Sequence, residues 1–312
     1  MSLRRVPPAF GTGACVALVI SALALCVRAQ TPDRSAPAGP VWNNNSLIAL
    51  QKKGGDPARP GDVAIDFYGH DAFKFTSPEG LTILVDPWRN DPAGLYPKWF
   101  LHNFPPLRVD IVLSTHAHFD HDAVSVPHGL MVLDRLAGRF RLGDVEITGL
   151  ADKHQCASTP SAVSNPSSAN SQTCPSVDAA GQDNAIQIIA TGGLRIAIWG
   201  DNRTLPDAFV DPYLKGIDVL ILPVDNVLPR PEADAVIRKY DPMAIIPAHY
   251  SIQGLSTQAS GLESADAWVA DQENAHHAEV RRLPTAHLTL NPVDLKGAHH
   301  RIYYFGDHFK KD

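Results

Sequence analysis

The stretch STHAHFDHD, Ser114–Asp122, places three histidines and two aspartates directly after a short apolar run. In an extended segment alternate side chains share a face, so His116 and His118 project to the same side, about 6.5 Å apart along the backbone. Asp120 and His121 follow where the chain turns, and they can face a neighbouring position. The stretch therefore predicts a site for two metal ions about 3.5 to 4 Å apart, the separation found in paired hydrolytic centres.

The alternative is a solvated turn that caps a helix starting near Asp122, a role that aspartate fills well. Capping requires one acid and no histidine. The density of histidines therefore favours the metal site.

Three further residues follow apolar runs, at the strand ends where α/β sheets gather their sites. Asp201 follows Ile196–Gly200, and a carboxylate there can bridge two cations. His249 follows Ile245–Ala248, and His154 lies four residues after another such run. The predicted set of metal ligands is His116, His118, Asp120, His121, His154, Asp201 and His249.

The first 29 residues have the pattern of an export signal. Arg4 and Arg5 precede an apolar core, Ala14–Val27, and Ala29 ends a segment typical of a signal peptidase site. About 14 apolar residues fall short of the ~20 that span a bilayer, so a retained anchor is the weaker alternative. We expect cleavage after Ala29, a secreted or periplasmic location, and no stable membrane insertion after cleavage.

The composition is that of an ordinary globular protein of 312 residues, with 44% apolar and 19% charged residues. Removal of the signal leaves 24 basic against 33 acidic residues, so we expect a small-molecule substrate and no nucleic acid. The oligomeric state is not predicted. Two cysteines remain, and a disulfide between Cys156 and Cys174 is favoured over a role for Cys156 as a metal ligand or reactive thiol.

Short apolar runs bounded by turn residues predict strands in two series. Helices are expected over Glu232–Tyr240 and Gly261–Ala275, and the mixture indicates an α/β sandwich. We expect a signal peptide over 1–29, a flexible leader over 30–60, and a single domain over 61–312 with a loop insertion at 155–184. The predicted strands are 63–68, 73–75, 81–85, 111–113, 131–133, 145–150, 185–190, 194–199, 219–223 and 244–247.

The order of these residues, preceded by Asp86, resembles the five motifs of the metallo-β-lactamase superfamily. The segments Tyr68–Phe73 and Ile246–Tyr250 look most like the branch of ascorbate phosphate lactonases and related metal-dependent hydrolases. The similarity covers Val63 to Tyr250. His70, within the first of these segments, either approaches the site or is a turn residue.

The resemblance implies an αββα sandwich, the metallo-β-lactamase fold, with two divalent metal ions at one edge. Zinc is the expected metal, and manganese or iron is possible. Asp86 is expected to orient the ligands. The implied sets are His116, His118 and His154 on one ion, Asp120, His121 and His249 on the other, and Asp201 between the two.

The chain departs from that branch in its export signal, in the Ser-rich insertion after His154, and in Asn202, where a threonine often follows the aspartate. These differences leave the predicted metal site intact. They do not allow the substrate to be carried over.

The sequence therefore predicts an exported metal-dependent hydrolase, in which a metal-activated hydroxide attacks a lactone, an ester or a phosphodiester. Asp120 and Asp201 are the expected catalytic carboxylates. Tyr250 either donates a hydrogen bond to the oxyanion or is a core residue. The alternatives are a β-lactamase and a non-catalytic metal-binding protein with the same fold.

Aromatic residues follow Asp86 in the sequence, and they either wall an apolar substrate pocket or pack beneath their loop. They are Trp88, Tyr96, Trp99 and Phe100. The pairs His276–His277 and His299–His300 are expected at the surface.

Overall fold

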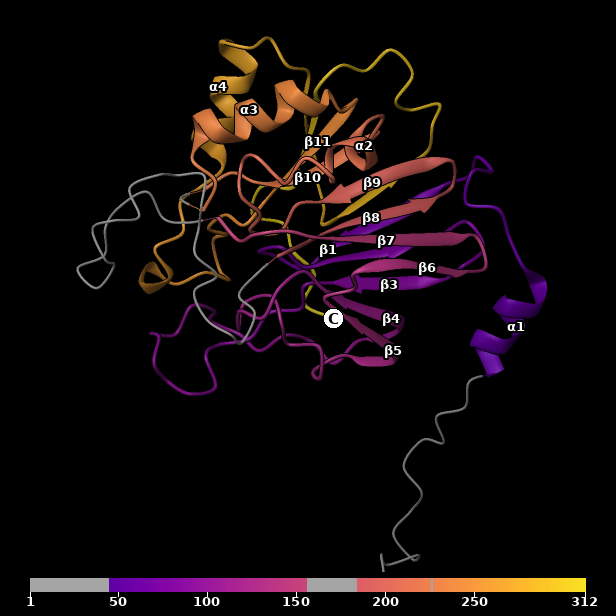
Figure 1. Ribbon diagram of the computed structural model, residues 1–312. Helices are drawn as coiled ribbons and strands as arrows, with labels where there is room; N and C mark the ends of the chain where they lie inside the picture. Colours follow the sequence, from indigo (N-terminus) through magenta and orange to yellow (C-terminus); the bar gives the residue numbers. More distant parts are fainter. Residues whose placement is uncertain (1–44, 156–183, 226) are drawn as a thin grey trace, which may run out of the picture. The chain divides into compact units, whose positions relative to one another are not determined.

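A computed structural model describes residues 45–155, 184–225 and 227–312. The predicted signal peptide, most of the predicted insertion and both Cys156 and Cys174 lie outside the described residues. Figure 1 shows two β-sheets that form the body of the described chain.

Within the described residues the first sheet has six strands, in the order β13-β1-β2-β3-β4-β5. The second has eight, in the order β12-β14-β11-β10-β9-β8-β7-β6. The first sheet contains β1 (Val63–Phe67), β2 (Phe73–Thr76), β3 (Thr82–Val85), β4 (Arg108–Ser114), β5 (His128–Asp134) and β13 (His287–Leu290). The second contains β6 (Gly138–Leu142), β7 (Val145–Ala151), β8 (Ala185–Thr191), β9 (Leu194–Ile198), β10 (Val219–Pro223), β11 (Ala244–Ala248), β12 (Val280–Arg282) and β14 (Arg301–Tyr304).

The apolar runs form strands because they are buried between layers. Every residue of β10 and β11 is buried, as expected for parallel strands covered on both faces. Side chains of both sheets contribute to one continuous hydrophobic core, in which Phe67 stacks on Phe73 and Phe305 with ring centroids 4.8 and 5.0 Å apart. All ten predicted strands are confirmed.

Helices are few in the described chain: α1 (Asn45–Lys53), α2 (Asp211–Leu214), α3 (Arg230–Tyr240), α4 (Asp266–Asn274) and the 3-10 turn η1 (Gln258–Ser260). Figure 1 places α3 and α4 together on the side of β10 and β11. Helix α3 buries four side chains: Ala233, Val236, Ile237 and Tyr240. No described helix is both long and apolar enough to cross a membrane.

Two helices differ from the sequence prediction. Helix α4 begins later than expected because the backbone of Glu263 accepts a hydrogen bond from Ser251, and the Ser264 hydroxyl then accepts one from the amide of Asp266. Helix α1 forms within the predicted leader, where Leu47 joins the core and Leu50 packs against it. Residues 45–53 of the predicted flexible leader therefore form a helix that packs on the core.

The strand directions bring seven loops to one edge. Strands β1, β3 and β4 run in the same direction in the first sheet, and β7, β9, β10 and β11 do so in the second. The predicted site residues follow the carboxyl ends of these strands. An amide hydrogen bond of 2.9 Å from His249, after β11, to the carbonyl of His70, after β1, joins the two sheets at this edge.

Candidate metal centre

The histidine-rich stretch leaves β4 as a tight turn. The amides of His121 and Asp122 both donate to the carbonyl of His118, at 3.0 and 2.8 Å. No helix begins near Asp122, and the next regular element is β5. The helix-capping alternative is therefore wrong, and the turn directs His116 and Asp120 into the protein, where both are buried.

A first group of ligand atoms comes from four residues, all within 4.8 Å of one another: His116, His118, His154 and Asp201. The His116 Nε2 atom lies 2.9 Å from His118 Nδ1 and 3.6 Å from Asp201 Oδ2. The His154 Nε2 atom lies 3.2 Å from the same Asp201 oxygen. These are three of the residues predicted for one metal ion, together with the predicted bridge.

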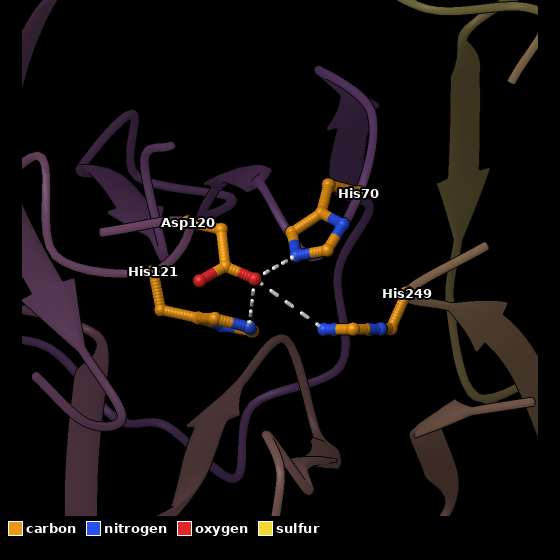
Figure 2. A group of neighbouring side chains, drawn as sticks. All are labelled: His70, Asp120, His121 and His249. Atoms are coloured by element: carbon orange, nitrogen blue, oxygen red, sulfur yellow. Dashed lines mark hydrogen bonds and ion pairs between the residues drawn. The ribbon is translucent and has the colours of Figure 1, made fainter. Parts of the chain in front are cut away.

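A second group is formed by His70, Asp120, His121 and His249, all of them buried. Figure 2 shows three imidazoles around one carboxylate oxygen, Asp120 Oδ2. It lies 3.0 Å from Nε2 of His70 and 3.6 Å from Nε2 of both His121 and His249. His70, left open by the sequence, is thus a member of the site and not merely a turn residue.

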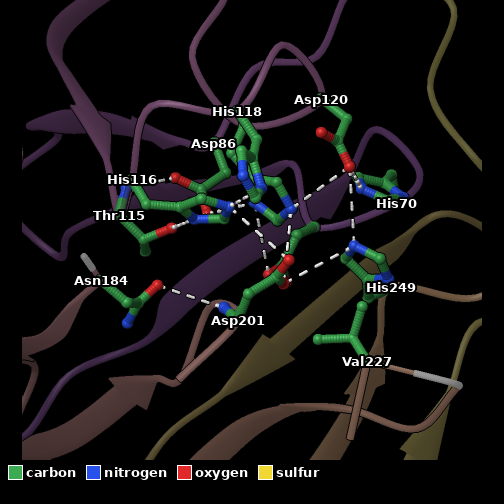
Figure 3. Close-up of polar contacts among 12 residues, drawn as sticks. His70, Asp86, Thr115, His116, His118, Asp120, Asn184, Asp201, Val227 and His249 are labelled. Atoms are coloured by element: carbon green, nitrogen blue, oxygen red, sulfur yellow. Dashed lines mark hydrogen bonds and ion pairs between the residues drawn. The ribbon is translucent and has the colours of Figure 1, made fainter. Parts of the chain in front are cut away.

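Asp201 connects the two groups, as Figure 3 shows. Its Oδ2 atom faces His116 and His154, while Oδ1 lies 3.5 Å from His121 Nε2 and 3.6 Å from His249 Nε2. One carboxylate therefore has an oxygen directed to each group. This is the arrangement expected of a carboxylate that bridges two cations.

The position of Asp201 depends on its neighbours. Gly200 has φ 55°, and a Cβ atom there would lie 2.6 Å from Asn184 Oδ1 and 2.7 Å from Thr115 Oγ1. Only glycine fits this position without displacing the strand exit. The amide of Asp201 donates to Asn184 Oδ1 at 3.2 Å, and a backbone bridge between His154 and Asn202 aligns the two loops.

Asp86 holds histidines of both groups. Its Oδ2 atom lies 2.9 Å from Nδ1 of His121 and accepts the Thr115 hydroxyl at 2.7 Å, while Oδ1 accepts the Thr115 amide at 2.7 Å. The Thr115 hydroxyl is also 3.0 Å from Nδ1 of His116. Carboxylates that hold the second ring nitrogen of a ligand histidine fix its tautomer and orientation. The predicted orienting role fits this geometry.

A second orienting carboxylate, Asp225, was missed by the sequence analysis. It follows β10 and its Oδ2 atom lies 3.0 Å from Nδ1 of His249. The signal was available, because Asp225 also stands just after a buried strand, but without a neighbouring histidine it is not distinctive in sequence.

The side chains of three site residues depend on unusual backbone conformations. His70, Asp86 and His249 have φ values of 59°, 47° and 56°, in the left-handed region that non-glycine residues rarely adopt. Such residues cost free energy, on the order of 1 kcal/mol each, and they cluster at functional sites.

Burial and mutual contact set the protonation of the groups. Burial lowers the pKa of His116 well below its usual value, and it lowers the pKa of His121 to about 3. Burial raises the pKa of a carboxyl, but the surrounding histidines outweigh it and hold the pKa of Asp120 and of Asp201 well below the usual value. At these four residues the neutral imidazole and the ionised carboxylate, the forms that bind a divalent cation, are therefore favoured.

Four other groups are protonated more readily. Burial opposes protonation of His249, but Asp225 and Asp201 raise its pKa well above the usual value, and Asp201 likewise raises that of His154. Burial raises the pKa of Asp71 to about 7 and that of Asp86 well above its usual value. A cation that binds here must displace protons from such groups.

The residues fit a divalent cation. Three buried atoms have no hydrogen-bond partner among the described residues and converge near one another: His121 Nε2, His249 Nε2 and Asp201 Oδ1. Leaving such atoms buried and unpaired is costly, and a metal ion satisfies all of them. The imidazole and carboxylate donors suit zinc, and they also accept manganese or iron.

Tyr250 does not take the predicted role. Its side chain is fully buried, its ring packs against Phe67 and Tyr304, and its hydroxyl donates to the carbonyl of Gly306 at 2.9 Å. The donor is thus used within the core, so the oxyanion-donor alternative is wrong and the core-residue alternative fits. The apolar context Ile246–Tyr250 gave no sign of which way the ring turns.

The aromatic residues after Asp86 divide into two pairs. Trp88 and Phe100 are buried and stacked, with ring centroids 4.3 Å apart, so they pack beneath the loop. Tyr96 is 59% exposed and Trp99 is partly exposed. Of the histidines expected at the surface, His276 (44%), His277 and His299 (75%) are exposed, whereas the His300 side chain is only 21% exposed.

Comparison with known proteins identifies the family. A family model described as a beta-lactamase superfamily domain matches residues 64–249. The chain therefore belongs to the metallo-β-lactamase superfamily and has its fold. The similarity to a lactonase-like branch stays a prediction.

Curated relatives include a metal-dependent hydrolase of Thermodesulfovibrio yellowstonii, 36% identical over 95 residues, which are 30% of this chain and 35% of that protein. A metal-dependent hydrolase of Anaeromyxobacter sp. is 28% identical over 31% of this chain and 44% of its own length. The chain thus spans less than half the length of these relatives. One from Rubrobacter xylanophilus is 26% identical over 61% of this chain and 82% of its own length.

Among solved structures, a metallo-β-lactamase superfamily protein of Thermotoga maritima has a TM-score of 0.50 at 20% identity. The superposition covers 78% of this chain and 97% of the other. This likeness supports the fold.

Proposed function

We propose that the protein is a metal-dependent hydrolase that binds two divalent cations, zinc first among them. The observation that carries this proposal is Asp201, which directs one oxygen to each of two groups of histidine and aspartate ligands. The first cation would be held by His116, His118 and His154, and the second by Asp120, His121 and His249. The names of the relatives agree with hydrolysis.

When bound, two divalent cations would lower the pKa of a water and would polarise the bond under attack. The residues of the chain orient the ligand side chains. Asp86 and Asp225 hold the Nδ1 atoms of His121 and His249, so that each Nε2 atom keeps its lone pair directed at the centre. Because Asp120 Oδ2 also contacts His70 at 3.0 Å, the Asp120 carboxylate is held in place, where it would accept the proton that the attacking water releases and pass it to the leaving group.

The substrate class proposed is a lactone or an ester, with a phosphodiester and a β-lactam as the competing classes. Each has a polarisable oxygen that such a centre can activate. The site geometry is common to all of them, so a panel of substrates is required.

The test measures bound metal and hydrolysis of a lactone, an aryl ester, an aryl phosphodiester and a chromogenic β-lactam. We expect about two cations per chain and metal-dependent turnover of the lactone or ester, with Asp201→Asn reducing both metal content and rate. Asp241→Asn, in an exposed histidine–aspartate cluster away from the centre, is the control. Two bound cations with no turnover of any member would favour the non-catalytic protein.

We also propose that the protein is exported, with cleavage after Ala29. This rests on the sequence pattern of residues 1–29 alone. Expression of the full chain, cell fractionation and N-terminal sequencing would test it. A product in the cytoplasm that retains residues 1–29 would contradict it.

A further inference from the structure

A line of aromatic rings leads from solvent to the metal centre. The Tyr96 ring lies 5.5 Å from that of Phe119, which lies 5.0 Å from Trp99, and Trp99 lies 6.4 Å from His70, with all distances between centroids. Exposure falls along this line from 59% at Tyr96 to 1% at His70. The last ring contacts Asp120, so the line ends at a residue of the centre.

Phe119 belongs both to the line of aromatic rings and to the turn that carries the ligands. It stands between His118 and Asp120 in the sequence, which belong to the first and the second group. Its carbonyl accepts a hydrogen bond of 3.1 Å from the amide of Arg89, so the ligand turn and the aromatic loop are fixed to one another. The backbone of Phe119 therefore joins ligands of both groups, while its ring contacts Trp99 and Tyr96.

The loop that carries Tyr96 and Trp99 is held in shape by side chains. The Asn90 Oδ1 atom accepts the amides of Trp99 and Phe100, both at 2.8 Å. The Asp91 carboxylate accepts the amides of Leu95 and Tyr96. A prearranged surface loses little conformational entropy when a ligand binds.

The exposure of this surface requires an explanation. Trp88 and Phe100 already fill the space beneath the loop, so the core does not need Tyr96 or the 83% exposed Leu95. Exposed apolar residues that lie together next to a site indicate binding. Aromatic rings supply a large apolar contact area with few rotatable bonds.

We propose that Tyr96, Trp99 and Phe119 bind the apolar part of the substrate, and that this substrate is an ester or lactone with a medium-length alkyl or aryl group. The proposal rests on the proposed function. The reacting carbonyl lies at the cations while the apolar chain extends over Phe119 towards Tyr96. Because the surface is apolar, it selects by chain length and not by charge.

The experiment compares aryl esters with acyl chains from acetyl to octanoyl, on metal-loaded protein. We expect kcat/KM to rise with each added methylene, by up to about fourfold where the methylene is fully buried, mainly through KM. Phe119→Ala and Tyr96→Ala flatten this slope, whatever their absolute rates. Tyr213→Ala, at a 42% exposed tyrosine on α2, is the control and keeps the slope.

A second readout does not depend on turnover. Binding of the product carboxylates, from acetate to octanoate, is measured by calorimetry on the same proteins. Equal affinity for acetate and octanoate, or slopes unchanged in Phe119→Ala, would overturn the aromatic surface even if hydrolysis is observed. Absence of hydrolysis across the panel with chain-length-dependent carboxylate binding would instead refute the proposed function and retain the surface.

Discussion

At the scale of single residues, an imidazole faces a cation only if its other ring nitrogen is held. Asp86 does this for His121 directly and for His116 through Thr115. In Asp86→Asn, an amide NH₂ would face the Thr115 hydroxyl or His121 Nδ1, which both act as donors. We expect affinity for both cations to fall about 10- to 100-fold, measured by competition with a chelator.

A matched control exists in β4. Asp110 accepts the amide and hydroxyl of Thr82 at 2.9 and 2.8 Å, much as Asp86 does with Thr115, but it contacts no histidine of the centre. Asp110→Asn should leave metal affinity unchanged. Equal losses in the two variants would show that the effect is structural and not a matter of ligand orientation.

Gly200→Ala tests the position of the bridging carboxylate. The new Cβ meets Asn184 and Thr115 at contact distances that proteins do not tolerate, so Asp201 must move. We expect a loss of about 1–3 kcal/mol in the free energy of unfolding and weaker binding of both cations. Urea unfolding and metal titration measure the two effects.

Gly297→Ala is the control for Gly200→Ala, because Gly297 has φ 76° and open space around its Cβ position. Gly297→Ala carries the same cost of a side chain at positive φ, but its new Cβ atom meets no neighbouring atom. Full metal affinity in Gly200→Ala would contradict the role assigned to this glycine.

How far the site was predictable depended on the residue. His116, His154 and Asp201 follow strands and have side chains that commonly bind metal ions, so they could be predicted from the sequence. The structure brings them together as expected. Asp225 was missed because a lone aspartate after a strand is common. The sequence could not decide between the two alternatives for Tyr250, because core neighbours that are distant in sequence set the rotation of its ring.

At the scale of elements, the buried strands were predictable and the marginal ones were not. Strands β10 and β11 are apolar throughout, which marks them in any sequence. Strand β13 alternates exposed and buried residues over four positions, and β12 has two exposed arginines. Such short segments become strands because a neighbour pairs with them, as β1 does with β13.

The loop between β3 and β4 has a structure of its own, in which Asn90 closes the segment 90–100. Its side chain makes three hydrogen bonds with the backbone of Trp99 and Phe100. At about 1 kcal/mol each, we expect Asn90→Ala to lower the free energy of unfolding by roughly 1–3 kcal/mol. Faster proteolytic cleavage within the loop should accompany this loss.

Asp91→Ala provides the comparison, since Asp91 caps the tip of the same loop. We expect a smaller loss of stability there, because its three hydrogen bonds are exposed to solvent. Limited proteolysis followed by mass spectrometry, with urea unfolding, distinguishes the variants. Indistinguishable variants would argue against Asn90 as the residue that closes the segment 90–100.

At the scale of the whole molecule, the centre is where the two sheets meet, so its charge state contributes to their stability. His154 and His249 have raised pKa values in the fold, and so have Asp71 and Asp86. Each of these groups binds its proton more tightly in the folded state than in the unfolded state. The stability contributed by the two histidines is fully present below pH ~6.5 and is lost as pH rises through their folded pKa.

We therefore expect the chelated protein to lose stability between pH 6.5 and 8, with a slope of at most about 1.4 kcal/mol per pH unit for each proton. The depressed pKa values of His116 and His121 act only below about pH 6.5, so they do not mask this loss. Bound cations displace the same protons, so the stabilisation by metal should grow with pH over that interval.

His154→Gln, which removes one such proton, should flatten the slope of the chelated protein. Urea unfolding at pH 6.5 and pH 8, with and without metal, measures the free energy of unfolding in each state. A chelated protein that is more stable at pH 8 than at pH 6.5 would contradict the expected loss.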